Sequence, residues 1–208
     1  MLKLVIFDCD GVILDSRLSN REYYNMLLAA FGHPSMTEAE LDFVHCHNVM
    51  DSVAFLFGRY PEDDVAAVHD YRIGVDYTPF LEYLTLEPDL KEFLHFLRPR
   101  HGTAISTNRT TTMPDILARF GLTRLFDLVV TATDVANPKP HAEALLKILD
   151  HFGVTAAEAI FIGDSIVDRQ HADTVGMRLI AYKNPDLAAE FHVERFMAIP
   201  SLPLLFES

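Results

Sequence analysis

Short apolar runs in this chain alternate with longer segments in which apolar residues recur every three or four positions. Residues 2–8 are almost continuously apolar, which is typical of a strand buried on both faces of a parallel sheet. Later runs of the same kind cover 102–107, 127–131, 159–163 and 178–182. Helical periodicity predicts one helix that begins at Pro88 and another, after the 102–107 run, that ends at Phe120. It predicts two more helices over 140–152 and 166–175. This alternation predicts an α/β fold, a Rossmann-like parallel sheet with helices on both faces.

Residues 16–85 have a different character, because the periodicity there is helical throughout and no convincing strand appears. Helices are expected over 16–31, 48–58 and 62–73, and Thr37 with Glu40 has the spacing of a capping box that starts another. The pattern therefore predicts a small all-helical domain at 16–85, inserted after the first strand of an α/β core formed by 1–15 and 86–208. From residue 186 on, we expect a helical piece and then an irregular end containing Pro200 and Pro203.

Composition and charge limit the classes of partner. The 208-residue chain has a formal net charge of −13, which disfavours binding to nucleic acid or to an anionic membrane, since phosphate backbones need a basic surface. No apolar run reaches the roughly 18 to 20 residues of a membrane span. Two cysteines outside any CxxC pattern indicate no disulfide framework, and with the absence of a signal segment they favour a cytoplasmic protein.

The first strand ends in two carboxylates, Asp8 and Asp10, followed by Gly11. Side chains alternate between the faces of an extended chain, so Asp8 and Asp10 are expected to point the same way. Two anions on one side of a strand end repel each other unless a cation lies between them or one serves as a nucleophile. Alone, the pair is as compatible with an Asx-type turn or a helix N-terminus.

Further polar residues follow the other predicted strands. They are Ser106-Thr107-Asn108, Lys139, and Asp164 with Asp168. Ligand sites in open α/β sheets lie outside the carboxyl ends of the strands, so these residues are expected to form one site with Asp8 and Asp10. Four converging carboxylates are best reconciled by a hard divalent cation, Mg²⁺ in particular. With a lysine and a threonine to receive phosphate oxygens, the set indicates phosphoryl transfer.

This set of residues resembles the haloacid dehalogenase superfamily. The matching segments are Asp8-Cys9-Asp10-Gly11, Thr107, Lys139-Pro140, and Gly163-Asp164 through Asp168. The position and helicity of 16–85 resemble the α-helical cap of the branch that contains phosphoglycolate phosphatase and β-phosphoglucomutase. The resemblance covers the whole core and the position of the cap.

The resemblance implies a role for each residue. Asp8 is the nucleophile that forms an aspartyl-phosphate, and Asp10 is the general acid and base. Thr107, Asn108 and Lys139 bind the phosphoryl group. The implied Mg²⁺ ligands are Asp8, Asp10 (through its backbone carbonyl), Asp164 and Asp168.

The function implied is that of a Mg²⁺-dependent phosphatase acting on a small phosphorylated metabolite, in a monomer or a homodimer. A phosphomutase acting on a sugar phosphate uses the same two aspartates and stays open, as does a non-catalytic phosphate-binding protein. A phosphonatase needs a cap lysine, and residues 16–85 contain none. A receiver-type signalling domain carries its phosphorylated aspartate after a later strand and has no cap.

Several other residues have simpler interpretations. Cys9 is expected to be a buried apolar residue between the two aspartates. His45-Cys46-His47 is not expected to hold a metal, because consecutive helical residues point about 100° apart. Contact of His47 or Asn48 with substrate is more plausible. Arg109 is expected at the surface at a helix start, and Arg17 and Arg21 are weak candidates for facing the site.

Overall fold

The computed structural model describes residues 1–203, apart from the side chain of Cys46. The chain divides into two compact units, Met1–Leu14 with Leu86–Ser208, and Asp15–Thr85. Each unit has a buried apolar core of its own. Within the described residues, no helix combines the length and apolar character needed to cross a membrane.

The first unit contains a six-stranded parallel sheet in the order β5-β4-β1-β6-β7-β8. The strands are β1 (Leu4–Phe7), β4 (Gly102–Ser106), β5 (Leu128–Val130), β6 (Ala159–Gly163), β7 (Arg178–Tyr182) and β8 (Phe191–Val193). The predicted α/β class and five of the predicted strands are confirmed.

β1 lies at the centre of this sheet, and all four of its residues are buried. Phe7 is paired with Ile105 of β4 on one side and with Ile162 of β6 on the other. This register brings the carboxyl ends of β1, β4 and β6 to one edge of the sheet. The loops that follow these strands carry the predicted site residues.

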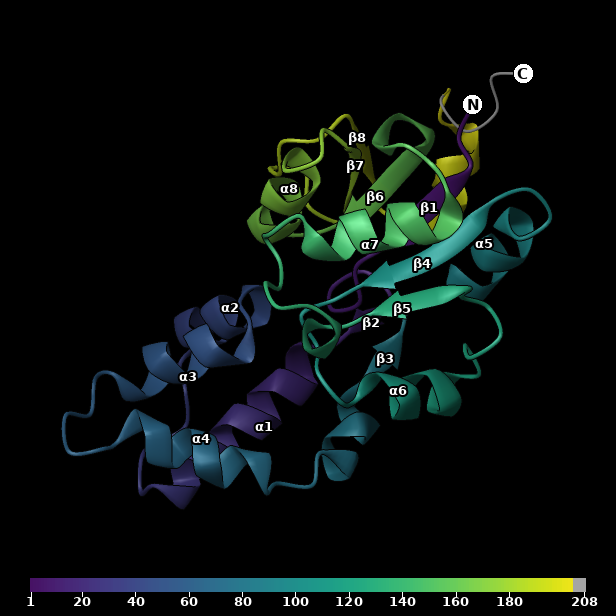
Figure 1. Ribbon diagram of the computed structural model, residues 1–208. Coiled ribbons are helices and arrows are strands. Elements are labelled where there is room, and N and C mark those ends of the chain that lie inside the picture. Colours follow the sequence, from purple (N-terminus) through teal and green to yellow (C-terminus); the bar gives the residue numbers. More distant parts are fainter. Residues whose placement is uncertain (204–208) are drawn as a thin grey trace. The chain divides into compact units, whose positions relative to one another are not determined.

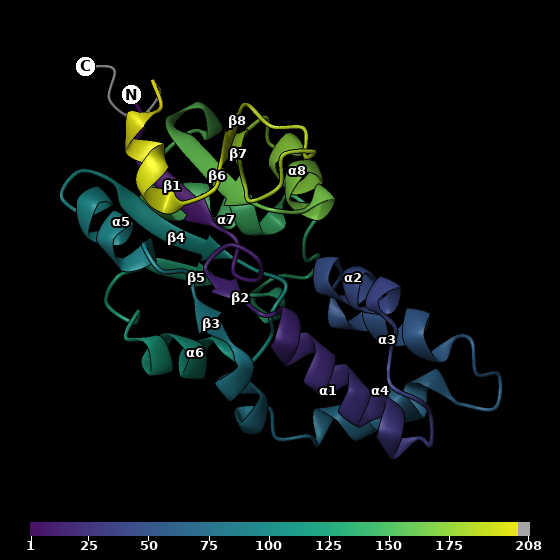
Figure 2. The ribbon, with the colours of Figure 1, turned by 180° about the vertical axis from the view of Figure 1, so that it is seen from behind.

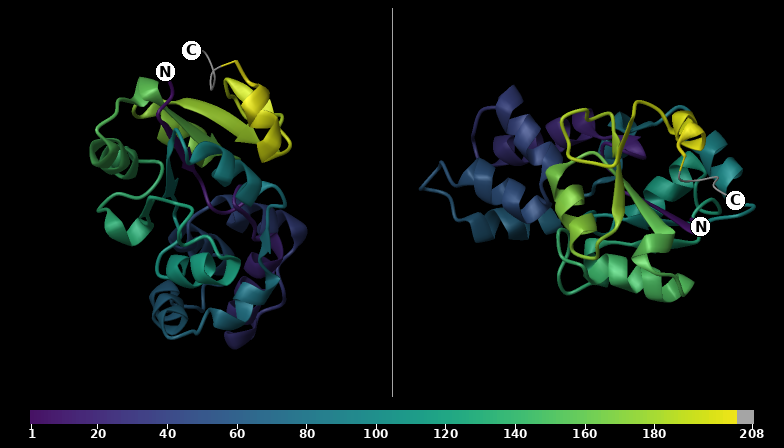
Figure 3. Two further views of the ribbon diagram at one scale, coloured as in Figure 1. Left: turned by 90° about the vertical axis from the view of Figure 1, so that its right-hand side faces the viewer. Right: turned by 90° about the horizontal axis from the view of Figure 1, so that it is seen from above.

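Helices cover both faces of the sheet (Figures 1 and 3). They are α5 (Leu90–Leu97), α6 (Met113–Phe120), α7 (Glu143–Phe152) and α8 (Ile166–Asp173), with short 3-10 helices η2 (Ala132–Asp134), η3 (Ala156–Glu158) and η4 (Phe196–Ser201). On one face, Leu4 and Ile6 join a cluster with residues of α7 and α8. On the other, the Phe7 ring contacts Phe93 of α5 and Phe196 of η4, as expected from side chains that alternate along β1.

The second unit is helical. It contains α1 (Arg17–Ala30), α2 (Glu38–Cys46), α3 (Val49–Phe57), α4 (Val65–Ile73) and η1 (Thr78–Tyr83), all seen in Figure 2. The capping box of Thr37 and Glu40 is present. The apolar core of the second unit includes Leu27, Val53 and Phe57. Two short strands at its chain boundaries, β2 (Leu14–Asp15) and β3 (Thr85–Leu86), pair with each other.

Two local predictions differ from the structure. The helix expected over 62–73 begins only at Val65, because the side chain of Asp64 accepts a hydrogen bond from the backbone N–H of Ala66 and caps the helix there. The helical piece expected after residue 186 is preceded by strand β8, which forms by pairing with β7. Residues 204–208 of the predicted irregular end lie outside the described part of the chain.

Candidate active site

The corner after β1 places Asp8 at the carboxyl end of the sheet. The backbone N–H of Asp8 donates to the carbonyl of Ile162 in β6 at 2.9 Å, so the strand pairing extends to this residue. Gly11 then turns the chain with a φ of +79°, and a Cβ at this position would overlap the Asp164 carboxylate. Only glycine combines this backbone conformation with so close an approach.

Lys139 bridges two carboxylates in the interior. Its ammonium donates to Asp8 Oδ1 at 2.6 Å and to Asp168 Oδ1 at 2.8 Å, and its side chain is only 4% exposed. It also lies over the ring of Phe161, 5.6 Å from the centroid. The structure thus brings together Lys139, Asp8 and Asp168, which are far apart in the sequence, as the strand-end argument predicted.

Asp168 has hydrogen-bond partners on both carboxylate oxygens. Oδ1 accepts a hydrogen bond from the Lys139 ammonium. Oδ2 accepts three hydrogen bonds, from the backbone N–H groups of Asp164 and Ser165 and from the Ser165 hydroxyl, at 3.2, 3.1 and 2.7 Å. Ser165 is the N-cap of α8, so Asp164 lies in the loop before the helix. Asp164 and Asp168 therefore do not stack on one face of the helix. The capping box instead turns Asp168 back toward Asp164.

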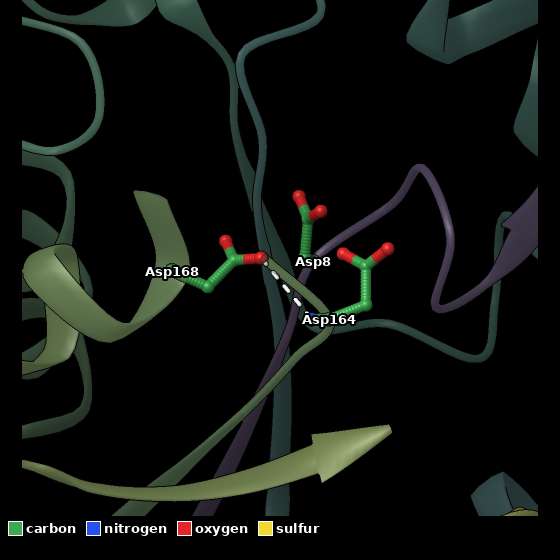
Figure 4. Close-up of side chains that lie close together, drawn as sticks. All are labelled: Asp8, Asp164 and Asp168. Atoms are coloured by element: carbon green, nitrogen blue, oxygen red, sulfur yellow. Dashed lines mark hydrogen bonds between the residues drawn. The ribbon is translucent and has the colours of Figure 1, made fainter. Parts of the chain in front are cut away.

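Asp8, Asp164 and Asp168 form the one three-carboxylate cluster found among the described residues (Figure 4). Each offers one oxygen, and these oxygens lie within 4.8 Å of one another. An all-oxygen donor set of this kind fits a hard divalent cation. The side chain of Asp10 is not in this cluster, and the predicted contribution of Asp10 to metal binding is its backbone carbonyl.

The cluster is electrostatically unbalanced. Burial, followed by the charge of Asp168, raises the pKa of Asp8 to about 7 despite the opposing effect of Lys139. Burial and the charges of Asp168 and Asp8 hold the pKa of Asp164 well above its usual range. Burial also acts to raise the pKa of Asp168, but the Lys139 ammonium and the donors of Ser165 outweigh it and lower that pKa. One ammonium is thus shared by three acids, and a further cation would stabilise all three charges.

Asp10 has a different partner. Arg109 forms a bidentate ion pair with it, with Nε 2.8 Å from Oδ2 and Nη2 2.6 Å from Oδ1. The Arg109 side chain is only 9% exposed, so its expected surface position is wrong. The Asp10 carboxylate is the acceptor that makes this burial possible.

Thr107 and Asn108 lie directly after β4. The Thr107 side chain is buried, and its hydroxyl accepts a hydrogen bond from the backbone N–H of Arg109 at 3.1 Å. Asn108 donates from Nδ2 to the backbone carbonyl of Lys139 at 3.3 Å. Asn108 therefore links the loop after β4 to the loop that carries Lys139. Phosphate binding by Thr107 and Asn108 stays a prediction.

Two supporting residues were not singled out in the sequence. Ser165 caps α8, and the spacing of Ser165 and Asp168 is a capping-box pattern that could have indicated it. Asn184, in the loop after β7, donates from Nδ2 to the backbone carbonyl of Asp164 at 2.7 Å. Its polar position after a predicted strand was the only available signal.

The cysteine prediction is confirmed, since Cys9 is fully buried between the two aspartates. Burial and the charge of Asp10 raise the pKa of its thiol.

In the second unit, the weaker candidates have local partners. Arg17 pairs with Glu38 and Asp42, and Arg21 pairs with Glu38. His47 lies with Nδ1 2.8 Å from the carbonyl of Phe43. The Cys46 side chain of the His45-Cys46-His47 segment lies outside the described residues.

Comparison with known proteins assigns the class. Residues 5–182 match the haloacid dehalogenase-like hydrolase family, and the chain belongs to this family. The predicted resemblance is therefore confirmed.

Three known proteins show how similar this chain is to other members of the family and to the fold. The phosphoglycolate phosphatase of Aliivibrio fischeri is 31% identical over 189 residues, which cover 86% of this chain and 83% of the relative. The crystal structure of a HAD-superfamily hydrolase of subfamily IA from Geobacter sulfurreducens PCA is 36% identical, with a TM-score of 0.79 over 96% of this chain and 95% of that one. The β-phosphoglucomutase of Clostridium difficile has a TM-score of 0.81 over 96% of this chain and 93% of that one, but at 19% identity it shows the shared fold alone.

Proposed function

We propose that the protein is a Mg²⁺-dependent phosphatase that hydrolyses small phosphorylated metabolites through an aspartyl-phosphate on Asp8. The observation that carries this proposal is the position of Asp8, buried at the end of the central strand, within 2.6 Å of Lys139 and beside two further carboxylates. The 31% identity to a phosphoglycolate phosphatase supports it. We propose residues 16–85 as the cap of this enzyme.

In the first step, a carboxylate oxygen of Asp8 attacks phosphorus, and the bond from phosphorus to the ester oxygen breaks. Asp10, in its protonated form, gives its proton to the leaving oxygen. In the second step, Asp10 takes a proton from water as the water oxygen attacks phosphorus. Asp8 is released as a carboxylate with inorganic phosphate, so the enzyme is regenerated.

The residues around Asp8 neutralise charge and fix positions. Lys139 lies against Asp8, where its ammonium reduces the repulsion between the nucleophile and a phosphate dianion. Asp8, Asp164 and the backbone carbonyl of Asp10 would hold Mg²⁺, and Asp168 would keep Lys139 and the Asp164 loop in place. Bound Mg²⁺ would supply charge neutralisation on the phosphoryl oxygens.

Phosphate release from a panel of esters, measured with Mg²⁺ and with EDTA, tests the proposal. The panel contains phosphoglycolate, pentose and hexose phosphates and p-nitrophenyl phosphate. Release without added sugar bisphosphate supports a phosphatase, whereas turnover that depends on the bisphosphate indicates the alternative phosphomutase. Absence both of Mg²⁺-dependent hydrolysis across the panel and of bisphosphate-dependent isomerisation of the sugar phosphates would contradict both and leave the non-catalytic alternative.

Asp8→Asn provides the decisive variant, because the amide keeps the shape of Asp8 and cannot serve as the nucleophile. We expect hydrolysis to be abolished while the circular-dichroism spectrum is unchanged. Asp150→Asn, at an exposed position in α7, is the matched control and should keep full activity. Retained hydrolysis in Asp8→Asn would refute the aspartyl-phosphate mechanism.

A further inference from the structure

His171 is a fully buried histidine that the proposed reaction does not use. It projects from α8, one turn after Asp168, and its side chain is inaccessible to solvent. Its ring packs edge-on against Phe161, with 5.7 Å between centroids and an interplanar angle of 80°. The ammonium of Lys139 lies over the same Phe161 ring. His171 is therefore only one side chain removed from the charged cluster.

A hydrogen bond joins His171 to the strand that precedes Thr107. Nε2 lies 3.0 Å from the hydroxyl of Ser106, the last residue of β4, and both side chains are fully buried. Desolvation of two polar groups in an apolar interior offsets most of the gain from their hydrogen bond, so the pair contributes little net stability. A pair of apolar side chains could fill the same space without that cost. The advantage of the His171–Ser106 pair therefore lies in the position it fixes.

The other side of the imidazole faces the loop that carries Lys139. Nδ1 is buried without a well-formed hydrogen bond within residues 1–203, and the backbone of Pro140 and His141 lies near the ring. Burial, followed by the charge of Lys139, lowers the pKa of His171 to about 4, and the backbone of Pro140 and His141 opposes this shift. The ring is consequently neutral near pH 7 and adds no second positive charge beside Lys139. It contacts three segments, namely α8, the end of β4 and the Lys139 loop.

We propose that His171 is a positioning residue, which through Ser106 holds Thr107 in place relative to Lys139 for binding of the phosphoryl group. This inference rests on the proposed function, because it assigns Thr107 and Lys139 to the same phosphate. Thr107 follows Ser106 directly, and its backbone N–H donates to the carbonyl of Val130 in the neighbouring strand. Loss of the His171–Ser106 bond would leave Thr107 attached to β5 but release its fixed position relative to α8 and Lys139.

The test compares three variants with the wild-type protein. His171→Leu keeps an apolar side chain of similar bulk without hydrogen bonds, His171→Gln keeps a polar group near the position of Nε2, and Ser106→Ala removes only the hydroxyl. The probe is inorganic phosphate in the presence of Mg²⁺, with affinity measured by calorimetry. KM and kcat on the best ester of the panel and the melting temperature complete the set. Ile148→Ala, in the apolar cluster on the same face of the sheet, is the control for simple loss of stability.

We expect His171→Leu to weaken phosphate binding and raise KM by about tenfold, the effect of one lost buried hydrogen bond. His171→Gln should recover most of this loss. The double variant with Ser106→Ala should be no worse than His171→Leu alone, because both changes remove the same bond. Ile148→Ala should lower the melting temperature and leave phosphate affinity within about twofold of wild type.

Unchanged phosphate affinity and KM in His171→Leu, with only a lower melting temperature, would overturn the inference. If His171→Leu does not fold, Ser106→Ala serves as the test in its place. Unchanged phosphate affinity in Ser106→Ala would then overturn the inference. If the wild-type protein binds phosphate but hydrolyses no ester, weakened binding in His171→Leu still supports the positioning role while the proposed function fails. If it neither binds phosphate nor hydrolyses any ester, both fail.

Discussion

Arg109 holds the carboxylate of Asp10 in two parallel hydrogen bonds, of 2.8 and 2.6 Å. Bidentate pairing fixes both the position and the direction of a carboxylate, and charge-assisted bonds of this kind are about twice as strong as neutral ones. The guanidinium is braced in turn by the hydroxyl of Thr112, which accepts from Nη1 at 3.3 Å. The proposed general acid and base is thus oriented by a residue from the loop after β4.

Replacing Arg109 by Gln is expected to lower kcat by about tenfold, because Asp10 would lose two charge-assisted hydrogen bonds and its fixed direction. Arg109→Lys should be intermediate, since an ammonium keeps the charge but cannot form the parallel pair. Steady-state kinetics on the best ester of the panel would measure both. Arg119→Gln, at an exposed position in α6, is the control. Wild-type kcat in Arg109→Gln would show that orientation of Asp10 by Arg109 is unimportant.

Removal of metal should have an effect that depends on pH. The pKa of Asp8 is raised to about 7 and that of Asp164 is also raised, so the metal-free folded protein retains protons at a pH where the carboxyls of the unfolded chain have lost them. The contribution of these two carboxyls to the free energy of unfolding of the metal-free protein therefore falls as the pH rises from about 4 to about 7. Because Mg²⁺ competes with these protons, its stabilising effect should grow over the same range.

Melting temperatures recorded with Mg²⁺ and with EDTA between pH 5.5 and 8 would measure this difference. Asp8→Asn removes one of the titrating groups, so its Mg²⁺-dependent shift should be smaller and should vary less with pH. An identical Mg²⁺ shift at every pH would contradict a site made of these carboxylates.

Gly11→Ala should weaken Mg²⁺ binding, because the new methyl group would overlap the carboxylate of Asp164. We expect a loss of about 10- to 100-fold in affinity, as found when groups that orient metal ligands are changed. The left-handed backbone adds a cost of about 1 to 2 kcal/mol in stability. Gly32→Ala is the matched control: its φ is +82°, and no described atom lies within 4 Å of the added Cβ. It should lose similar stability without loss of Mg²⁺ affinity, and equal Mg²⁺ affinity in both variants would disprove the overlap at Asp164.

The buried His171 should make the protein sensitive to acid. Its pKa of about 4 lies below the ordinary value of 6.5, so between these values the unfolded chain binds a proton that the folded protein does not. The free energy of unfolding should therefore fall as the pH falls from about 6.5 to about 4, by on the order of 3 kcal/mol from this group. His171→Leu removes this contribution.

Urea unfolding of wild type and His171→Leu across this range isolates the effect, since all other groups are shared. The stability difference between the two proteins should shrink as the pH falls. His151→Gln, at an exposed histidine, should follow the wild-type dependence. A constant difference between wild type and His171→Leu would mean that His171 titrates alike in the folded and unfolded states.

Strands buried on both faces were readable from the sequence, because every residue of β1 and β6 except the terminal Gly163 is apolar. β8 could not be predicted from the sequence, since its three residues include the exposed His192 and the strand forms only through pairing with β7. Helix limits were set by single capping side chains such as that of Asp64, which periodicity does not reveal.

In the site, the contact between Asp8 and Lys139 followed from the rule that strand ends meet at one edge of a parallel sheet. The position of Arg109 did not follow, because an arginine next to a loop is usually solvated and its burial here depends on Asp10, a residue distant in the sequence. His171 gave no signal either. A single histidine within a helical pattern is uninformative until its partner, Ser106, is known.

The central position of β1 has a consequence for synthesis on the ribosome. Residues 4–7 are synthesised before their neighbours in the sheet, which begin only at Gly102 and Ala159. Until then, an apolar strand with unpaired backbone groups is exposed and prone to pairing with other chains. Residues 15–85 have a buried core of their own and are complete before β4 is made. The order of synthesis therefore favours folding of the inserted unit first, after which β1 pairs with β4 and last with β6.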